Sequence, residues 1–313
     1  MTAASGSIFF NKDQTMQDLT ETTVTAAALA QMGGTADPRL REIMDAAVRH
    51  LHAFARDVRL TPEEWLKAIG FLTEVGHMCT PIRSEFILLS DVLGLSALVN
   101  LMHDQTAAEK GTDTSLLGPF YRDAAPALAL GESIIATPSV PEIVIYGQIT
   151  NADGKAIPHA TVQVWQTDEH GEYDLQSFGA EKMDRRGNFT ADVQGRFHFR
   201  TVRPLGYSIP MDGPVGALVG AQRRHGFRPS HIHFLIGGAG YRELVTALYF
   251  ADDDHIDSDT VFGVSRSLVV QAKDDPAAPL RLPAVRYDFT LSREAAGRDS
   301  RVGADPSQLV KAL

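Results

Sequence analysis

The chain has 313 residues, 44% of them hydrophobic and 22% charged, which is the composition of an ordinary globular protein with one large or two modest domains. Its formal net charge of −10 argues against binding to nucleic acid, because contacts with a phosphate backbone need a basic surface. The single cysteine, Cys79, excludes an internal disulfide and a thiolate metal cluster, and it suits a reducing compartment.

Residues 1–14 contain no basic segment followed by an apolar core, so we expect no secretion signal and a cytoplasmic protein. The most apolar run extends from Phe86 to Met102, but Asp91, Gly94 and Asn100 interrupt it. We therefore interpret this run as buried helix and expect no membrane span.

Helix signals dominate the first third of the chain. Asp37 and Pro38 predict an N-cap followed by a proline in the first turn, and an apolar stripe at spacings of three and four follows them. Thr61 and Glu64 predict the start of the next helix, because they have the spacing of a capping box. We predict an α-helical domain over residues 1–105.

From about residue 106 onward, glycine and proline recur and the apolar runs shorten, which is typical of strands joined by turns. The expected strands are 143–149, 160–166, 195–202, 231–236, 244–250, 268–272 and 287–291. We therefore predict an α+β protein, in which the helical domain is followed by an antiparallel β-sandwich over residues 106–313.

One expected strand begins with His231 and His233. Alternate residues of a strand share a face, so the two imidazoles point the same way, about 7 Å apart, and can reach one metal ion. An isolated pair of this kind is more simply explained as two histidines on a polar sheet face. A carboxylate would complete an iron(II) site, although Glu243 is poorly placed for it. A zinc site needs a third histidine, and the spacing of the available histidines, His225 and His255, recommends neither.

Two tyrosines offer a different ligand set. Tyr173 and Tyr207 each follow an expected strand, in loops rich in polar residues, glycine or proline, where functional side chains often stand on a rigid scaffold. Taken singly, each is better explained as a packed ring with a solvated hydroxyl.

The motifs GEYD at 171–174, PLGYSIPMDGPVG at 204–216 and RPSHIHF at 228–234 resemble, in this order, those of the intradiol ring-cleaving dioxygenases. The segment LGPFY at 117–121 resembles a further motif of that family, and the helical start resembles its linker and dimerisation domain. The resemblance implies a non-haem iron(III) ion with hydroxide as one ligand. The protein ligands that it implies are Tyr173, Tyr207, His231 and His233.

The ligand types suit that chemistry, because two anionic phenolate oxygens favour iron(III) over iron(II) or zinc. The resemblance implies that an aromatic diol is opened by O2 between its two hydroxyl-bearing carbons, and that Tyr207 leaves the metal to accept a substrate proton while Tyr173 stays bound. Arg228 is expected to stabilise negative charge in a dry site. Its alternative role is a surface salt bridge.

The segments 83–94 and 257–264 resemble the hydroxyquinol branch of the family, which implies cleavage of 1,2,4-trihydroxybenzene to 3-hydroxy-cis,cis-muconate and maleylacetate. A buried Asp91 would accept a hydrogen bond from the third hydroxyl, unless it is simply a carboxylate at a helix end. The pocket carried over by position comprises Leu88, Asp91, Leu117, Gly118, Pro119, Phe120, Ile209, Pro210, Arg228 and Val261.

One position departs from the catechol branch, which carries a glutamine where this chain has Ala247. Catechol or a substituted catechol, giving cis,cis-muconate, is nevertheless the alternative substrate, and a metal-free β-sandwich binding module is the alternative of another class. The resemblance also implies a homodimer joined through the N-terminal helices, a region in which the family can hold a lipid.

Overall fold

The computed structural model describes residues 18–80, 83–104, 110–136, 138, 140–179 and 182–293. Its helices are α1 (Val24–Gln31), η1 (Met32–Gly34), α2 (Pro38–Asp57), α3 (Pro62–Met78), α4 (Glu85–Val92), α5 (Leu95–Asp104), α6 (Asp174–Phe178), α7 (Pro214–Ala221) and η2 (Arg266–Leu268). Its strands are β1 (Glu142–Asn151), β2 (Thr161–Gln166), β3 (Arg186–Thr190), β4 (Arg196–Val202), β5 (Tyr207–Ser208), β6 (Phe227–Arg228), β7 (His231–Gly237), β8 (Leu244–Phe250), β9 (Val269–Val270), β10 (Ala284–Arg286) and β11 (Phe289–Leu291). The chain divides into two compact units, Met1–Thr73 and Glu74–Leu313.

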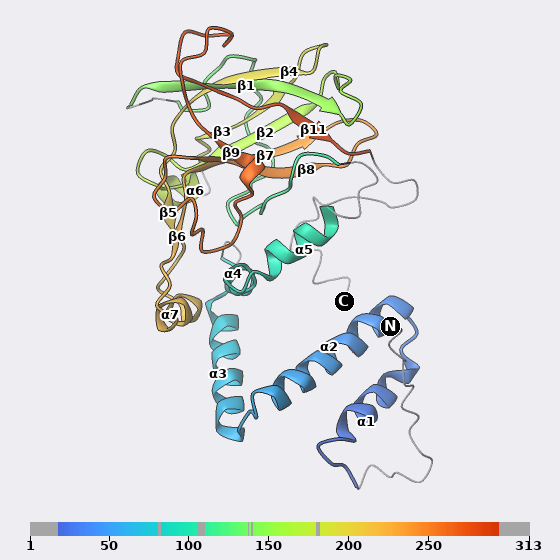
Figure 1. The fold of residues 1–313 in the computed structure, drawn as a ribbon. Coiled ribbons are helices and arrows are strands. Elements are labelled where there is room, and N and C mark those ends of the chain that lie inside the picture. The colour runs from blue at the N-terminus through green and yellow to red at the C-terminus, as the bar shows by residue number, and fades with distance from the viewer. Residues whose placement is uncertain are drawn as a thin grey trace. The chain divides into compact units, whose positions relative to one another are not determined.

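The first unit contains α1, α2 and most of α3 (Figure 1). The carboxylate of Asp37 caps α2 by accepting hydrogen bonds from the backbone N–H groups of Arg39, at 2.8 Å, and Leu40, at 3.3 Å. A capping box starts α3, because Glu64 accepts the Thr61 N–H at 2.9 Å and the Thr61 hydroxyl accepts the Glu64 N–H at 3.3 Å. Both predicted helix starts are confirmed.

The apolar stripe of α2 lies on the surface. No residue of α2 is buried, and Leu51 and Phe54 are 65% and 55% exposed. This amphipathic helix therefore presents an apolar face that the described residues of its own unit leave uncovered.

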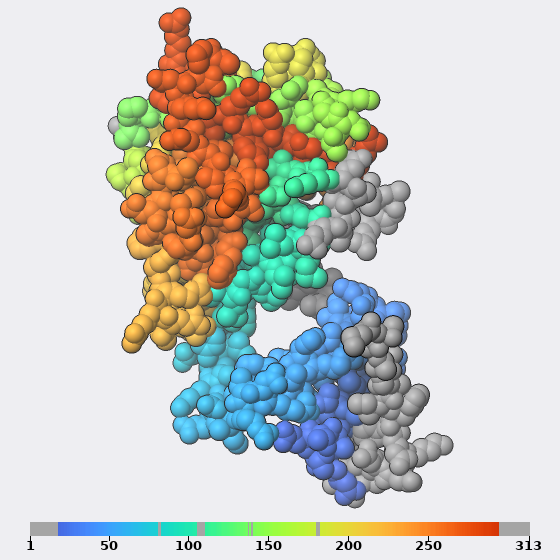
Figure 2. Space-filling model, in the orientation of Figure 1, coloured from blue at the N-terminus to red at the C-terminus, as the bar shows by residue number. Residues whose placement is uncertain are grey.

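The second unit is built on two sheets that face each other (Figure 1). One has the order β10-β1-β11, with β4 also paired to β1, and the other has the order β3-β2-β7-β8-β9; β5 and β6 form a separate ribbon. Figure 2 shows that the segment after β8, coloured orange to red, forms much of the surface of this unit on the face in view. The predicted α+β class and sandwich are confirmed, but β1 pairs in parallel with β10 and β11, as β8 does with β9. The sheets are therefore mixed, because these short late strands arrive through long loops rather than hairpins.

The core between the sheets follows from the alternation of side chains along the strands. Ile145 and Ile149 of β1 belong to it together with Ile232, Phe234 and Ile236 of β7, and all five are fully buried. β7 is the middle strand of its sheet. Its alternate residues, among them His231 and His233, point to the other face of that sheet. The two histidines of the H-x-H motif are therefore held by a rigid strand whose other face anchors the core.

The run from Phe86 to Met102 is helical as we expected, but its apolar side chains are not all buried. It forms α4 and α5, which Gly94 separates at a φ of +75°, and several of its apolar side chains are about half exposed. Among the described residues no single helix is long and apolar enough to cross a membrane, and α4 and α5 reach that length and composition only as a pair bent by 72°. Both helices lie in the second compact unit, which begins at Glu74. The domain boundary that we expect near residue 105 stays a prediction.

Candidate functional site

His231 and His233 point from β7 toward each other at their ring tips. The two Nε2 atoms lie 3.1 Å apart, and both side chains are buried. The His231 Nδ1 donates to the carbonyl of Pro229 at 2.6 Å, because a carbonyl can only accept. In the neutral ring, this bond leaves the lone pair of the His231 Nε2 directed into the site.

Burial keeps both imidazoles uncharged. Desolvation, reinforced by the nearby Arg228 charge, lowers the pKa of His231 to about 3. Desolvation and the neighbouring His231 lower the pKa of His233 well below its usual range. At neutral pH the two rings therefore offer nitrogen lone pairs to a cation without competition from protons.

The two predicted tyrosines converge on the same place. Tyr173 lies at the start of α6, with its Oη 3.5 Å from the His231 Nε2, and it is fully buried. Tyr207 lies on β5, and its ring meets that of Tyr173 edge-on, with centroids 5.5 Å apart. Two phenol oxygens and two imidazole nitrogens therefore come from three separate segments, the start of α6, β5 and β7.

Local hydrogen bonds fix the loop that carries Tyr173. The carboxylate of Asp168 accepts the backbone N–H groups of His170 and Glu172, each at 2.8 Å, and the side chain of Gln176 accepts the Tyr173 N–H at 2.9 Å. Gly171 has a φ of +85°, and a Cβ there would lie 2.9 Å from the Gly206 carbonyl oxygen. Glycine at 171 therefore lets the loop of Tyr173 pass close to the loop of Tyr207.

Stacked rings orient the donors. Trp165 of β2 lies opposite His233 in the strand register, and its ring stacks on the imidazole at 4.9 Å with an interplanar angle of 4°. Phe120 stacks on Tyr173 at 4.2 Å and 15°. These contacts keep water away from the donors and restrict the rotation of the rings.

The donor set fits a hard trivalent cation better than a divalent one. Burial and the neighbouring Tyr207 raise the pKa of Tyr173 well above its usual value, so its phenolate form needs a strongly charged partner. Within the described part of the chain, no three His, Cys, Asp or Glu side chains form a group that could hold a metal. The His-carboxylate and three-histidine alternatives therefore find no site there, and the rings of His225 and His255 lie next to each other instead, with centroids 4.8 Å apart and planes tilted by 33°.

A cavity of about 400 Å³ opens beside these donors. Arg228 and Tyr207 belong to its wall, and so does Asp91, whose pKa burial raises. The other predicted pocket residues that line it are Leu88, Gly118, Pro119, Phe120, Ile209, Pro210 and Val261. Leu117 does not line the cavity as we expected. Its neighbour Leu116 does, while Leu117 packs on Trp165, Tyr173 and Tyr207.

Two protein-family models match the chain, "Catechol dioxygenase N terminus" over residues 37–111 and "Dioxygenase" over residues 118–293. A 6-chlorohydroxyquinol 1,2-dioxygenase of Cupriavidus pinatubonensis is 44% identical over 277 residues, covering 88% of this chain and 99% of the relative. The chain belongs to the intradiol dioxygenase family. This confirms the resemblance that the sequence motifs carry.

Other relatives agree with this assignment to the dioxygenase family. A hydroxyquinol 1,2-dioxygenase of a Rhizobium species is 38% identical, with 85% of this chain and 93% of the relative covered. The crystal structure of hydroxyquinol 1,2-dioxygenase from Pseudomonas putida DLL-E4 matches with a TM-score of 0.82 at 38% identity, covering 88% of this chain and 99% of that one. Catechol 1,2-dioxygenase of Acinetobacter radioresistens matches with a TM-score of 0.76 at 26% identity, covering 90% and 97%.

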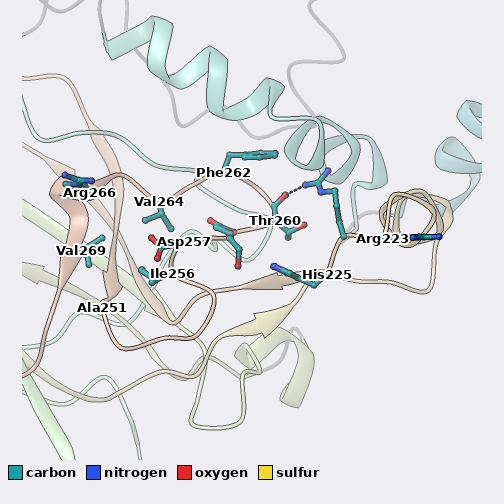
Figure 3. A pocket seen from close by; sticks show the side chains of 13 residues that line it. Arg223, His225, Ala251, Ile256, Asp257, Thr260, Phe262, Val264, Arg266 and Val269 are labelled. Atoms are coloured by element: carbon teal, nitrogen blue, oxygen red, sulfur yellow. Dashed lines mark hydrogen bonds between the residues drawn. The ribbon is translucent and has the colours of Figure 1, made fainter.

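A second and larger cavity of the dioxygenase, about 850 Å³, contains none of the four donors (Figure 3). Arg223, Arg224 and His225 line it, and of these Arg224 has a structural role. Its guanidinium donates to the carbonyls of Val92 and Thr260, each at 2.8 Å; the second bond is dashed in Figure 3. These three residues therefore belong to this second cavity and not to the donor site.

Several residues of the site escape prediction from the sequence. Trp165 and Tyr249 lie on strands whose alternation indicates only that they are half-buried, and Asp259 lies in a loop motif that we assigned only to the substrate branch. Register supplies the missing information, because Trp165 pairs with His233 and Tyr249 pairs with His231 across the sheet. A strand pairing predicted in advance would have identified both.

Proposed function

We propose that this dioxygenase cleaves hydroxyquinol, 1,2,4-trihydroxybenzene, with O2 between its two adjacent hydroxyl-bearing carbons. Both oxygen atoms enter the product, 3-hydroxy-cis,cis-muconate, whose keto form is maleylacetate. The observation that carries the proposal is the convergence of two tyrosine and two histidine side chains at one buried place, where Tyr207 also lines a cavity of about 400 Å³. The hydroxyquinol and chlorohydroxyquinol dioxygenases among its relatives support the substrate.

The proposed cofactor is a non-haem iron(III) ion held by Tyr173, Tyr207, His231 and His233. When bound, iron(III) supplies a site that holds both oxygens of the diol and makes its ring reactive toward O2. The uncharged histidines bind without releasing protons, whereas each tyrosine must lose one. Burial makes this deprotonation harder at Tyr173, and the charge of a bound iron(III) ion would offset that cost.

Two residues are proposed to act on the substrate directly. Tyr207 accepts a proton from one diol hydroxyl, and its Oη lies 3.4 Å from the Arg228 Nη1. Arg228 lines the cavity and stays positively charged in its buried position, so it stabilises the negative charge that develops on the diol.

Asp91 is proposed to select the triol. It lies on α4 in the cavity wall and is 8% exposed, and burial raises the pKa of its carboxyl group. A hydrogen bond to the third hydroxyl would compensate this buried group, whereas catechol would leave it without that partner. The remaining wall is largely apolar.

Catechol is the second candidate, since the cavity has room for it and Arg228 and the donor set serve both substrates alike. A metal-free binding module needs one of the four donors or Arg228 to be missing from the chain, and the sequence carries all five. We also propose a cytoplasmic homodimer joined through the N-terminal helices, a region able to hold a lipid. The uncovered apolar face of α2 supports that surface.

Oxygen uptake with hydroxyquinol, catechol and chlorinated catechols, measured side by side on iron-loaded protein, tests the function. We expect the highest kcat/KM with hydroxyquinol and a dicarboxylic acid product that has gained both atoms of ¹⁸O₂. A higher kcat/KM with catechol than with hydroxyquinol would make catechol the assigned substrate. No uptake with any of the diols would reject ring cleavage.

A further inference from the structure

The guanidinium of Arg228 forms hydrogen bonds with three side chains. It is 3% exposed, and its Nε and Nη2 donate to the two carboxylate oxygens of Asp259 at 3.3 and 3.5 Å. Its Nη2 also donates to the Tyr249 hydroxyl at 3.3 Å, while its Nη1 donates to the Tyr207 hydroxyl at 3.4 Å. Asp259 and Tyr249 therefore hold the far side of the guanidinium, and the near side is directed at a proposed metal ligand.

The direction of the hydrogen bonds around Tyr249 is determined by Ser115. The Ser115 hydroxyl has one proton, and it donates that proton to the carbonyl of Gly263 at 3.0 Å. Ser115 must then accept from the Tyr249 hydroxyl, 2.7 Å away. The Tyr249 oxygen is left to accept from Arg228, so the chain of donors runs from Arg228 through Tyr249 and Ser115 to the backbone.

Asp259 is fixed by its own loop. Its two carboxylate oxygens accept the backbone N–H groups of Val261, at 3.3 Å, and Gly263, at 3.0 Å. A carboxylate anchored in this way cannot turn to follow a moving guanidinium, so the loop sets the position of Arg228.

Gly263 leaves the space in which these groups meet. A Cβ at this position would lie 2.7 Å from the Tyr249 Oη, 3.0 Å from the Arg228 Nη2 and 3.0 Å from the Asp259 Oδ2. Even a methyl group would therefore push apart the three side chains, although it removes none of their polar atoms.

We propose that Asp259 and Tyr249 are positioning residues, which hold the Arg228 guanidinium against the Tyr207 hydroxyl in the space that Gly263 leaves open. Neither of them lines the 400 Å³ cavity, so both act through Arg228. The expected effect on kcat rests on the proposed function, whereas the expected effect on the stability of the metal-free protein does not.

The test is a double-mutant cycle in which D259N and Y249F are each made in the native chain and in an R228M background. In the native chain we expect D259N to lower kcat for hydroxyquinol by about 10²-fold, since small misplacements of a catalytic group cost this much, with little change in KM. In the R228M background the same substitution should lower kcat by less than about threefold, because the group through which it acts is gone. Equal losses in both backgrounds would overturn the proposal.

A second arm needs neither iron nor substrate. In the metal-free protein, D259N should lower the melting midpoint because it leaves the Arg228 charge buried and unpaired, and R228M should recover part of that loss. Additive losses in this cycle would overturn the inferred contact. If the native enzyme consumes no O2 with any diol, the proposed function fails, but this arm still decides whether Asp259 holds Arg228.

G263A provides the steric version of the test, and G220A is its matched control. Gly220 lies in the same unit as Gly263, but a Cβ at Gly220 would meet no atom within 4 Å. We expect G263A to lower kcat by at least about tenfold and G220A to leave it unchanged. A G263A protein with native kcat would overturn the role of the close packing around Arg228.

Discussion

The Nε2 atoms of His231 and His233 face each other at 3.1 Å. Each ring is fixed by a contact of its own. The His231 Nδ1 donates to the Pro229 carbonyl, and Trp165 stacks on His233. Since burial keeps both rings uncharged, their lone pairs are already directed into the site before a metal arrives. Such pre-arrangement of ligands by their own hydrogen bonds and packing is typical of metal centres with a fixed geometry.

Tyr173→Phe should weaken iron(III) binding and remove part of the visible absorption, because tyrosinate-to-iron charge transfer makes such a protein wine-red. The loss of a hydrogen-bond partner of a metal ligand already costs about 10–100-fold in affinity, so the loss of a ligand should cost at least as much. Iron content and the visible spectrum after loading measure the effect. The control is Tyr146→Phe on β1, whose hydroxyl donates to Asp275 at 2.6 Å. A colourless native protein in the presence of iron(III) would contradict the ligand set.

The stability of the metal-free protein should depend on pH through His231. Burial lowers the pKa of this ring from 6.5 to about 3, so between these values the unfolded chain carries a proton that the folded chain does not. The free energy of unfolding should therefore rise as the pH increases from about 3 to 6.5, by up to roughly 5 kcal/mol from this ring, and then level off. Urea titrations at a series of pH values measure the slope. His231→Gln should reduce the slope and leave the part that comes from His233, whose pKa is also lowered by burial, whereas substitution of the exposed His170 by Gln should leave the slope unchanged.

Asp91→Asn should change the choice of substrate more than the overall rate. A hydrogen bond to a charged group contributes about 1.5–3 kcal/mol, so kcat/KM for hydroxyquinol should fall by roughly 10- to 150-fold. Catechol turnover should fall much less, because catechol lacks the hydroxyl in question. The comparison is Asp212→Asn, an exposed carboxylate that pairs with Arg83 in the cavity wall. Equal losses for the two diols would leave Asp91 with a purely structural role.

The parts of the fold that could be predicted are those with a local cause. The caps at Asp37 and Thr61 and the alternation along β7 depend on neighbouring residues, and all of them appear where the sequence indicated. Likewise, the two tyrosines were found because each stands in a motif with its own strand and loop.

The parts that could not be predicted depend on contacts between distant segments. Asp259 meets Arg228 across 31 residues, and Ser115 meets Tyr249 across 134, so neither spacing nor alternation could reveal them. Ala247 stands where the catechol branch carries a glutamine, and nothing in the sequence indicated that Tyr249 and Asp259 would be the neighbours of Arg228. The position of Leu117 was also missed, since the face to which an irregular segment turns is set by packing on Trp165 and the tyrosines.

The exposed face of α2 should be the place where two copies meet. Leu51 and Phe54 are 65% and 55% exposed, and covering such side chains contributes about 1.5–3 kcal/mol each. Leu51→Glu combined with Phe54→Glu should therefore convert a dimer into a monomer, as measured by light scattering on a sizing column. Arg49→Glu, on the opposite side of the same helix, adds the same carboxylate away from the apolar stripe and should keep the dimer. A native protein that is monomeric at micromolar concentration, or a double variant that stays dimeric, would show that this face does not join the subunits.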